Sequence, residues 1–548
     1  MNTRRLILLL IVCPCLALGN QLEQPIKTRL TVVIIVDQCA YQFIRKLKDY
    51  FTGGIQHLLD KGVVYENAYH PHGLPATATG FTAFNTGTVA NYHGMTNNAW
   101  FSKDGKEILC DDDTPENAAV FSKDGFYTYG KSAKNIMVDG LSDQVMLDRQ
   151  PSSENYVFGI SNKSRSAICL ANKLGKAIWF DPVAGQFTSS KTYFNKLPEW
   201  LIHFNNKLTI NRLEEFTWKK LYPSTYPAYS LKDATNYTYS KYQQGLIDNP
   251  IKIGPRYHKK DPYDIWNKTP YANKAVLDLA RACINHYAPQ TSGQLVILLG
   301  LSALDLVSHR QGPDSIETTD LLLRLDQQLQ DFFASVEQIV PPEQTLYVFS
   351  ADHGVDPIPE LMAERGMPAG RINADTFVDT INRTINKKYG IAKSIWSLHC
   401  PNLYLNEAVL QKLSAEKRNA LLRDIVTVVK KQHGVANAWT YDELMNTYYE
   451  PYQFECWYKN QLYPGRSGTI IFQPLPYYQF TNKNAGTTHE TPYEFNTHVP
   501  LIFYQKNRFK PAVVWQKVWI LQVANTLAHL IDVPKPSTST AELLPGLI

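Results

Sequence analysis

The chain has 548 residues, of which 44% are hydrophobic and 19% charged, a balance typical of a globular protein with one large domain or two to three smaller ones. Its 55 basic and 50 acidic side chains leave a formal net charge of +5 at pH 7, too small and too scattered to indicate nucleic-acid or membrane binding. We therefore expect small-molecule partners, no nucleic acid and no stable membrane insertion.

The N-terminus carries the pattern of an export signal. Two arginines precede an apolar run at 6–12, and a small-x-small cleavage pattern ends at Gly19. We predict a signal peptide over 1–19 and a mature chain over 20–548 that is exported, either periplasmic or secreted. The alternative is that this run forms the first apolar element of the fold, but strand-like sequence restarts cleanly after it.

Four apolar, β-branched runs end in polar residues, at 30–36, 294–299, 345–350 and 499–504. Runs of this kind are typical of a parallel sheet that is covered on both faces. At 315–336, apolar residues recur at spacings of three and four behind candidate N-caps, which predicts a helix. We expect an α/β fold with a central, mostly parallel sheet and helices on both faces.

Between about 155 and 285 the sequence becomes rich in Tyr, Trp, Asn, Lys and Pro, and its periodicity is weak. This texture predicts an inserted cap region built on loops within the single catalytic domain. A second aromatic, Pro-containing stretch follows at 448–478.

Polar residues follow three of the apolar runs, the second taken on to Leu304, at the positions where ligands bind in α/β sheets. They are Asp37, the pair Asp305 and His309, and the pair Asp352 and His353. Each alone has a simpler interpretation as a turn residue, a helix cap or a solvated helix pair. Together, carboxylate and imidazole groups at one sheet edge are what zinc selects where thiolates are absent.

A sixth ligand is expected in the C-terminal part of the chain. His489 lies in a loop that leads toward the last apolar strand, and His498 is its competitor directly before that strand. Six ligands exceed the three protein ligands of one catalytic zinc site. Two zinc ions could then clamp the entering and leaving oxygens of an in-line phosphoryl displacement.

The order and spacing of these motifs resemble the PafA-like alkaline phosphatases of the alkaline phosphatase superfamily. The resemblance spans nearly all of the mature chain and implies an alkaline phosphatase-like fold and hydrolysis of phosphate monoesters through a phosphothreonine intermediate. The segments that carry it are 32–38, 74–80 with Thr86-Gly87, 93–100, 162–168, 305–309 with Gly312-Pro313, 351–354 and 486–489.

The resemblance also implies the ligand sets of two zinc ions per chain. One zinc is placed on Asp305, His309 and His489. The other is placed on Asp37, Asp352, His353 and the nucleophile Thr77. Metal coordination would lower the pKa of the threonine hydroxyl and so activate it. Thr79 remains the rival nucleophile, and a capping hydroxyl is the simpler interpretation of Thr77.

Three further residues match those that bind phosphoryl oxygens in the family, namely Asn98, Lys163 and Arg165. Arg165 offers a two-pronged donor and Lys163 a point charge, whereas the alternative is a pair of surface charges on a loop. Phe81 and Asn85 depart from the family pattern behind the nucleophile, where a His and a Tyr are usual.

The nearest rival function is a phosphodiesterase or nucleotide pyrophosphatase on the same fold. Lys163 and Arg165 favour a monoester, because its phosphoryl group carries one more charged oxygen than a diester. A sulfatase is disfavoured, because no Cys or Ser is followed by x-Pro-x-Arg after the first strand. A non-catalytic secreted binding protein is the alternative from another class.

Overall fold

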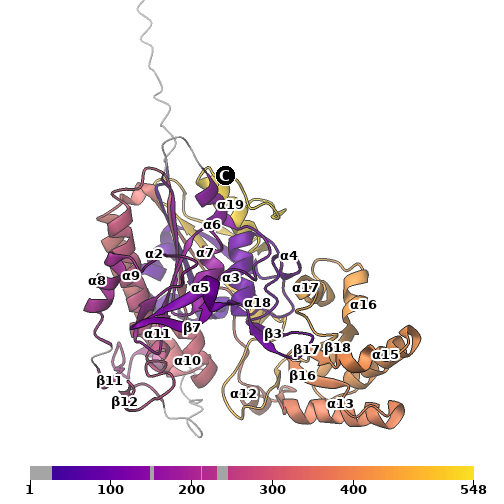
Figure 1. Cartoon of the computed structure of the whole chain (residues 1–548). Coiled ribbons are helices and arrows are strands. Elements are labelled where there is room, and N and C mark those ends of the chain that lie inside the picture. The colour runs from indigo at the N-terminus through magenta and orange to yellow at the C-terminus, as the bar shows by residue number, and fades with distance from the viewer. Residues whose placement is uncertain (1–26, 149–153, 211–212, 231–244, 548) are drawn as a thin grey trace, which may run out of the picture.

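The computed structural model describes residues 27–148, 154–210, 213–230 and 245–547 of the chain (Figure 1). The predicted signal peptide lies outside the described residues. Within the described part of the chain, no helix combines the length and the apolar character needed to cross a bilayer.

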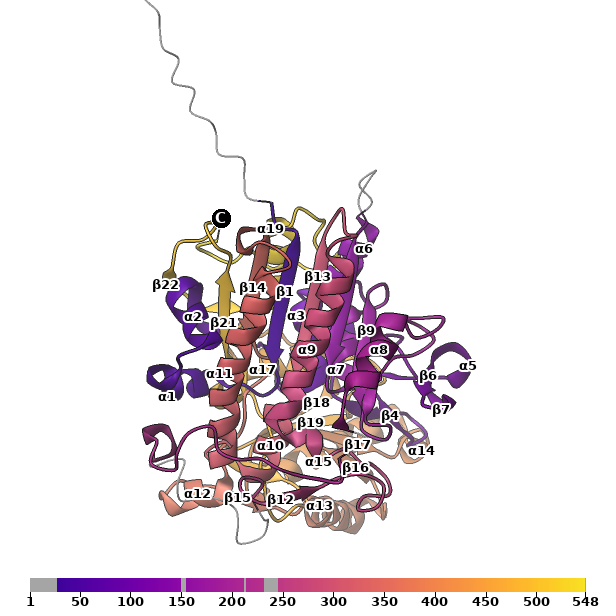
Figure 2. The same cartoon turned by 90° about the vertical axis from the view of Figure 1, so that its left-hand side faces the viewer.

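A ten-stranded sheet forms the centre of the larger body (Figure 2). The strands in spatial order are β10 (Gln186–Thr188), β9 (Lys176–Asp181), β8 (Tyr156–Ser161), β13 (Leu295–Leu301), β1 (Leu30–Val36), β14 (Thr345–Ser350), β21 (His498–Tyr504), β2 (Val63–Tyr69) and β22 (Ala512–Val514), with β23 (Val518–Trp519) also on β2. The five neighbouring strands from β9 to β14 are parallel, whereas β10 and β21 pair antiparallel with the strands beside them. This confirms the expected mostly parallel sheet.

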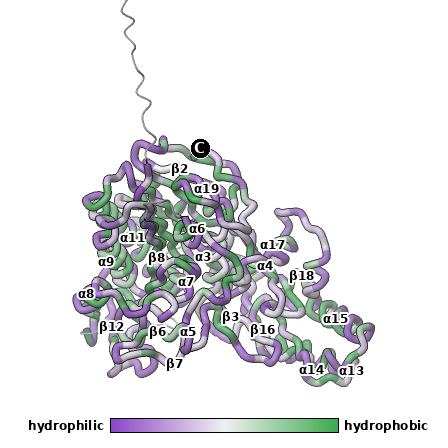
Figure 3. The backbone as a smooth tube through the Cα atoms, turned by 45° about the horizontal axis from the view of Figure 1, so that its top comes forward, coloured by the Kyte–Doolittle hydropathy of each residue, from purple (hydrophilic) through white to green (hydrophobic). Residues whose placement is uncertain are grey.

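Helices cover both faces of this sheet, as expected (Figures 1 and 2). One face carries α2 (Gly54–Lys61), α9 (Pro270–Tyr287) and α11 (Ile316–Glu337), and the other carries α3 (Thr77–Thr86), α6 (Leu141–Leu147), α7 (Ser164–Ala171) and α19 (Gln522–Leu530). The helix predicted at 315–336 is α11, and the Ser315 hydroxyl caps it by accepting a hydrogen bond from the Thr318 amide at 3.2 Å. Hydrophobic positions gather between these layers (Figure 3), where β1, β13 and β14 are buried along their whole length.

A smaller body stands beside the sheet and has its own hydrophobic core (orange in Figure 1). Its antiparallel sheet has the order β16 (Ile395–His399), β17 (Asn402–Leu405), β19 (Ile470–Pro474) and β18 (Val435–Thr440). The helices α13 (Ala374–Tyr389) and α15 (Ala415–Lys430) complete that core. The aromatic, Pro-containing stretch at 448–478 lies partly within this smaller body. We did not predict the smaller body as a separate unit.

The segment expected to be a cap insertion contributes more to the central layers than its texture suggests. It contains β8, β9, β10 and α9, and among the described residues the loop-rich part is confined to about 190–210, 213–230 and 245–268. The aromatic residues that weakened the periodicity are themselves strand residues, such as Trp179 and Phe180 in β9. The loop-rich part is fastened to α11 by the Asp320 carboxylate, which accepts hydrogen bonds from Trp218 Nε1 and the Leu221 amide, both at 2.7 Å.

Candidate active site

The predicted metal ligands meet at one edge of the central sheet. Asp37 follows β1 and the pair Asp352 and His353 follows β14, while α10 (Ala303–Gln311) begins directly after β13 and carries Asp305 and His309. Because parallel strands share an edge at their carboxyl ends, side chains from distant parts of the sequence converge there. All but His309 among these five residues are almost fully buried.

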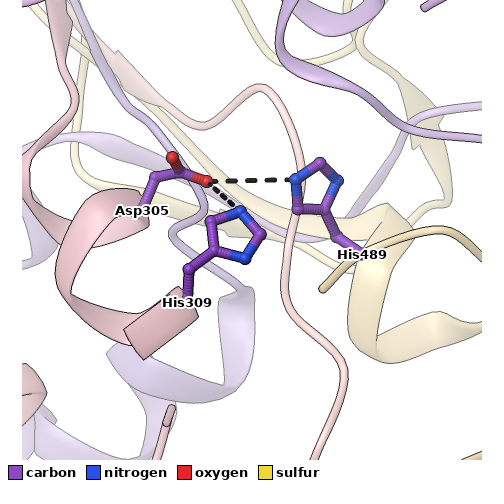
Figure 4. Close-up of side chains that lie close together, drawn as sticks. All are labelled: Asp305, His309 and His489. Carbon is purple, nitrogen blue, oxygen red and sulfur yellow. Dashed lines mark ion pairs between the residues drawn. The ribbon is translucent and has the colours of Figure 1, made fainter. Parts of the chain in front are cut away.

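Two groups of side chains have ligand atoms that all lie within 4.8 Å of one another among the described residues. The first group is Asp305, His309 and His489 (Figure 4). In it, Asp305 Oδ1 lies 3.0 Å from His309 Nε2 and 3.9 Å from His489 Nε2. The helical spacing of four residues brings the first pair together, and the loop at 486–489 delivers the third side chain.

The second group consists of Asp37, Asp305 and His353, so Asp305 belongs to both. Asp352 lies against this group, with its Oδ2 atom 3.3 Å from His353 Nε2. Its other oxygen accepts hydrogen bonds from the backbone amides of Gln38 at 3.1 Å and His353 at 3.0 Å. The Asp352 carboxylate is therefore held with one oxygen toward the backbone and one toward the site.

The three site histidines are oriented in the same way. Each Nδ1 donates a hydrogen bond to a backbone carbonyl, which leaves Nε2 as the nitrogen with a free lone pair. The accepting carbonyls are those of Thr487 for His309 at 2.7 Å, Gly354 for His353 at 2.9 Å and Pro75 for His489 at 2.9 Å.

Several buried polar atoms of the site have no hydrogen-bond partner. They are Asp37 Oδ1, Asp305 Oδ1, Asp352 Oδ2 and His353 Nε2. Unpaired buried acceptors are costly, and they are rare in proteins unless an ion or water satisfies them. Burial and the neighbouring Asp37 raise the pKa of Asp352 well above its usual range, so a proton or a cation is needed beside this carboxylate. The donor set of carboxylate oxygens and imidazole nitrogens fits a divalent metal such as zinc.

Lys163 lies between the two groups rather than on the surface. Its Nζ atom donates hydrogen bonds to Asp37 Oδ2 at 2.7 Å and to Asp305 Oδ2 at 2.5 Å. Burial opposes ionisation of Asp305, but the ammonium of Lys163, together with the His309 ring in its protonated form, holds the pKa of Asp305 well below its usual range. Arg165 stands in the first turn of α7, and its buried Nε has no hydrogen-bond partner.

The two candidate nucleophiles differ in how their hydroxyl groups are used. Thr77 is the first residue of α3 and is 1% exposed. The Thr79 hydroxyl donates to the Met95 carbonyl at 2.8 Å and accepts from Gln461 Nε2 at 3.1 Å, so it is committed to the interior. Of the two, the geometry therefore favours Thr77.

Asn98 contacts the beginning of the same helix. Its Oδ1 atom accepts a hydrogen bond from the Ala78 amide at 2.9 Å. An amide side chain held by its oxygen presents its nitrogen as a donor on the other side. Asn98 is thus positioned beside Thr77 with its Nδ2 group as the available end.

His498, the competitor of His489, lies outside the site. Its ring is stacked between Tyr41 and Tyr69, with ring centroids 4.4 and 4.5 Å away. Its Nε2 donates to the Glu66 carbonyl at 2.8 Å, so the ring is part of the packing between β2 and β21.

The two departures from the family pattern are buried in the layer behind the nucleophile. Phe81 is fully buried in the core of the larger body. Asn85 donates to the carbonyls of Cys169 and Leu170, both at 3.0 Å, and accepts from the Ser142 amide at 3.1 Å. Asn85 thereby ties α3 to α7 and α6.

Sequence reasoning missed Gln38 and a second group of histidines. Gln38 has a φ of 69°, unusual for a residue other than glycine, and its Nε2 donates to His309 Nε2 at 3.3 Å. The sequence feature that could have identified Gln38 was its position directly after a strand-end aspartate. His70, His72 and His93 form a fully buried group, with ring centroids 6.4 Å apart for His70 and His72 and 6.2 Å apart for His72 and His93.

Residues 31–500 match the family described as type I phosphodiesterase / nucleotide pyrophosphatase. The chain belongs to this family. It is 28% identical to the alkaline phosphatase PafA of Elizabethkingia meningoseptica, with 95% of both chains covered. It is 26% identical to the alkaline phosphatase PhoV of Synechococcus elongatus, with 95% of this chain and 93% of that one covered. The crystal structure of PafA superposes with a TM-score of 0.82 at 26% identity, covering 94% of this chain and 98% of that one. These matches confirm the resemblance and the fold.

Proposed function

We propose that this protein is a two-zinc alkaline phosphatase that hydrolyses phosphate monoesters through a phosphothreonine intermediate on Thr77. The assignment as a phosphoric monoester hydrolase rests on its relatives, because PafA and PhoV are named alkaline phosphatases and nearly the whole chain aligns with them. The number of zinc ions, the phosphothreonine intermediate and the roles of individual residues are inferred from the side chains of this protein.

The observation that best supports two zinc ions is that the two ligand groups share Asp305. Two metal sites that share a carboxylate lie close enough to act on one phosphoryl group. Bound zinc would lower the pKa of a coordinated hydroxyl and stabilise charge on the phosphoryl oxygens. The unpaired buried atoms Asp37 Oδ1, Asp305 Oδ1 and His353 Nε2 support a cation at the second group, and Asp305 is shared with the first.

The chain's own residues supply the rest of the chemistry. Thr77 attacks phosphorus from the N-terminus of α3, where the helix dipole favours an anion, and the alcohol leaves on the opposite side. Water then attacks the phosphothreonine and releases inorganic phosphate, which restores the threonine. Asn98 through Nδ2, and Lys163 and Arg165 through their charges, hold the non-bridging oxygens during both steps.

A solved variant of PafA supports this set of residues. In that variant a threonine and an asparagine 21 positions later are substituted, as are a lysine and an arginine two positions apart. Thr77 and Asn98 have the first spacing in this chain, and Lys163 and Arg165 have the second.

The second candidate function is a phosphodiesterase, which the family description favours. The burial of Lys163 between two carboxylates argues for the monoester, because a buried cation beside the phosphoryl site suits a dianionic group. Matched aryl monoester and diester substrates separate the two candidates. A higher kcat/KM for the diester in the wild type would promote the phosphodiesterase.

The nucleophile is tested by quenching the enzyme with acid during turnover and locating the phosphate by mass spectrometry. We expect phosphate on Thr77 and none on Thr79. The variant Thr77→Ala should fold and still hold zinc through the Asp and His ligands but lose the trapped phosphate, whereas phosphate on Thr79 would show that the other hydroxyl reacts.

We also propose that the enzyme acts after export, outside the cytoplasm. The N-terminal pattern ending at Gly19 motivates this proposal. N-terminal sequencing of protein from an expressing bacterial cell should find a chain that begins at about residue 20. A periplasmic or secreted enzyme that retains its first 19 residues would contradict it.

A further inference from the structure

Asp356 is a buried carboxyl group that sequence analysis did not single out. It is 2% exposed and lies four residues after Asp352. Its amide donates to the Thr488 carbonyl at 2.8 Å, and its carbonyl accepts from the Thr487 hydroxyl at 2.7 Å. The backbone of Asp356 is therefore bonded to the two residues that precede His489.

The side chain of Asp356 bonds to the far end of the same loop. Its Oδ1 atom accepts from Asn496 Nδ2 at 2.6 Å and from the Thr491 hydroxyl at 3.3 Å. Asn496 Nδ2 also donates to the Thr491 carbonyl at 3.1 Å, and the Asn496 carbonyl accepts from the Gly354 amide at 2.7 Å. One buried residue thus holds both ends of the segment 487–491 against the segment 352–356.

The loop held in this way controls two of the three ligands in the first group. It carries His489 itself, and its Thr487 carbonyl orients the ring of His309. It also packs tightly against α10, since a Cβ atom on Gly486 would lie 2.2 Å from the His309 carbonyl. A small displacement of the loop would move His489 and release the ring of His309 together.

Apart from the stacking of the His353 ring on His489, with ring centroids 3.7 Å apart, the second group is held by other contacts. Asp37 follows a buried strand, Asp352 is fixed by the Gln38 amide, and His353 is fixed by the Gly354 carbonyl. None of these contacts involves the Asp356 side chain. Loss of that side chain should therefore affect the two groups unequally.

We propose that Asp356 is a positioning residue that holds the loop of His489 in place and so sets the metal affinity of the group Asp305, His309 and His489. This inference deepens the proposed function, because it assumes that the group binds zinc. It assigns to Asp356 no contact with the substrate or the metal.

The test compares Asp356→Ala with Asp356→Asn, because the amide keeps an acceptor oxygen of the same shape. Asp143→Ala is the matched control. Asp143 is also 2% exposed and accepts three backbone hydrogen bonds, from Gly140 at 3.0 Å, Lys173 at 3.1 Å and Leu174 at 2.9 Å, but it contacts no ligand loop. The measurements are zinc release to a chromogenic chelator and amide hydrogen exchange over 486–491 in zinc-free protein.

In Asp356→Ala we expect one of two zinc ions to bind about 10- to 100-fold more weakly, the range for residues that orient metal ligands, and the other to be unchanged. Exchange over 486–491 should quicken. Asp356→Asn should be close to wild type in both measurements, and Asp143→Ala should alter neither the loop nor the zinc. Equal weakening at both sites, or loop exchange like that of the wild type, would overturn the proposal.

If Asp356→Ala does not fold, Asn496→Ala removes the donor from the other side and should produce the same selective effect. A wild type that binds no zinc would refute the proposed two-zinc function. The hydrogen-exchange comparison needs no metal, so it would still decide whether Asp356 holds the loop.

Discussion

Among the described residues, one group of histidines lies in the active site and another lies fully buried in the interior, and their surroundings differ. In the active site, His309, His353 and His489 each donate from Nδ1 to a backbone carbonyl, and their Nε2 atoms face carboxylates. In the second group, His70 Nε2 donates to the Ala351 carbonyl at 3.0 Å, and His93 Nδ1 accepts from the Met95 amide at 3.1 Å. Both nitrogens of His72 are buried without a hydrogen bond.

The difference shows what burial alone does to an imidazole. Burial lowers the pKa of His70 to about 4 and of His93 to about 3, so these rings are neutral and able to bind a metal. Yet among the described residues, only the site histidines belong to a group whose ligand atoms converge. Carboxylates within reach, and a backbone that aims each ring, distinguish a candidate metal centre from a buried polar cluster.

The largest expected effect comes from removing the carboxylate that the two ligand groups share. Asp305→Asn should weaken both zinc ions and lower kcat/KM by more than the roughly 100-fold seen for outer-shell partners, because a direct ligand is lost. Elemental analysis and a chromogenic monoester assay measure both effects. A variant that keeps two zinc ions and its activity would show that Asp305 does not join the groups.

The next effect is expected from the cations that follow β8, whose loss removes contacts to the substrate but no metal ligand. Lys163→Ala combined with Arg165→Ala removes two charge-assisted contacts of about 1.5–3 kcal/mol each, so kcat/KM for an aryl monoester should fall by roughly two to four orders of magnitude. The matched diester should lose much less. Equal losses on both substrates would mean that the pair supports the site without distinguishing the charge of the phosphoryl group.

The second histidine group should appear in the pH dependence of stability. The pKa of His70 is 6.5 in the unfolded chain and about 4 in the folded protein. Between these two values the unfolded chain binds a proton at His70 and the folded protein does not, so the unfolded state becomes more favourable as pH falls. The contribution of the neutral, buried His70 to the free energy of unfolding is therefore fully present above pH 6.5 and is lost as pH falls toward 4. His70→Gln keeps a donor for the Ala351 carbonyl and does not titrate.

The free energy of unfolding of the wild type should therefore fall by about 2 kcal/mol more than that of His70→Gln between pH 7 and pH 5. Denaturant titrations at the two pH values measure this difference. Parallel losses in the two proteins would mean that His70 is not buried in its neutral form.

The smallest effect is expected at His72. Burying a polar ring without a hydrogen-bond partner costs free energy, and an apolar ring does not have this cost. His72→Phe should therefore leave kcat/KM unchanged. Its free energy of unfolding should either rise or fall by about 1 kcal/mol or less. A large loss of activity would instead mean that His72 serves the site through a partner such as bound water.

Much of the sheet could be predicted because its signals are local. The apolar run of β1 and the cap at Ser315 are each contained in a few neighbouring residues, and the rule for strand ends then points to Asp37, Asp305 and Asp352. The smaller body escaped prediction, because its strands β16 and β18 are only partly buried and lack the continuous apolar run of β1. Asp356 escaped for a different reason, since its partner Asn496 lies 140 residues away and no local pattern links the two.

The loop that carries His489 also has a consequence for the order of folding. The ligand groups draw on residues from position 37 to position 489. A chain that ends before residue 489 therefore lacks a complete first group, whatever the state of β1, β13 and α10. The first group is completed only when a late loop docks onto elements from earlier parts of the chain, so its assembly is a marker of tertiary folding and not of local structure.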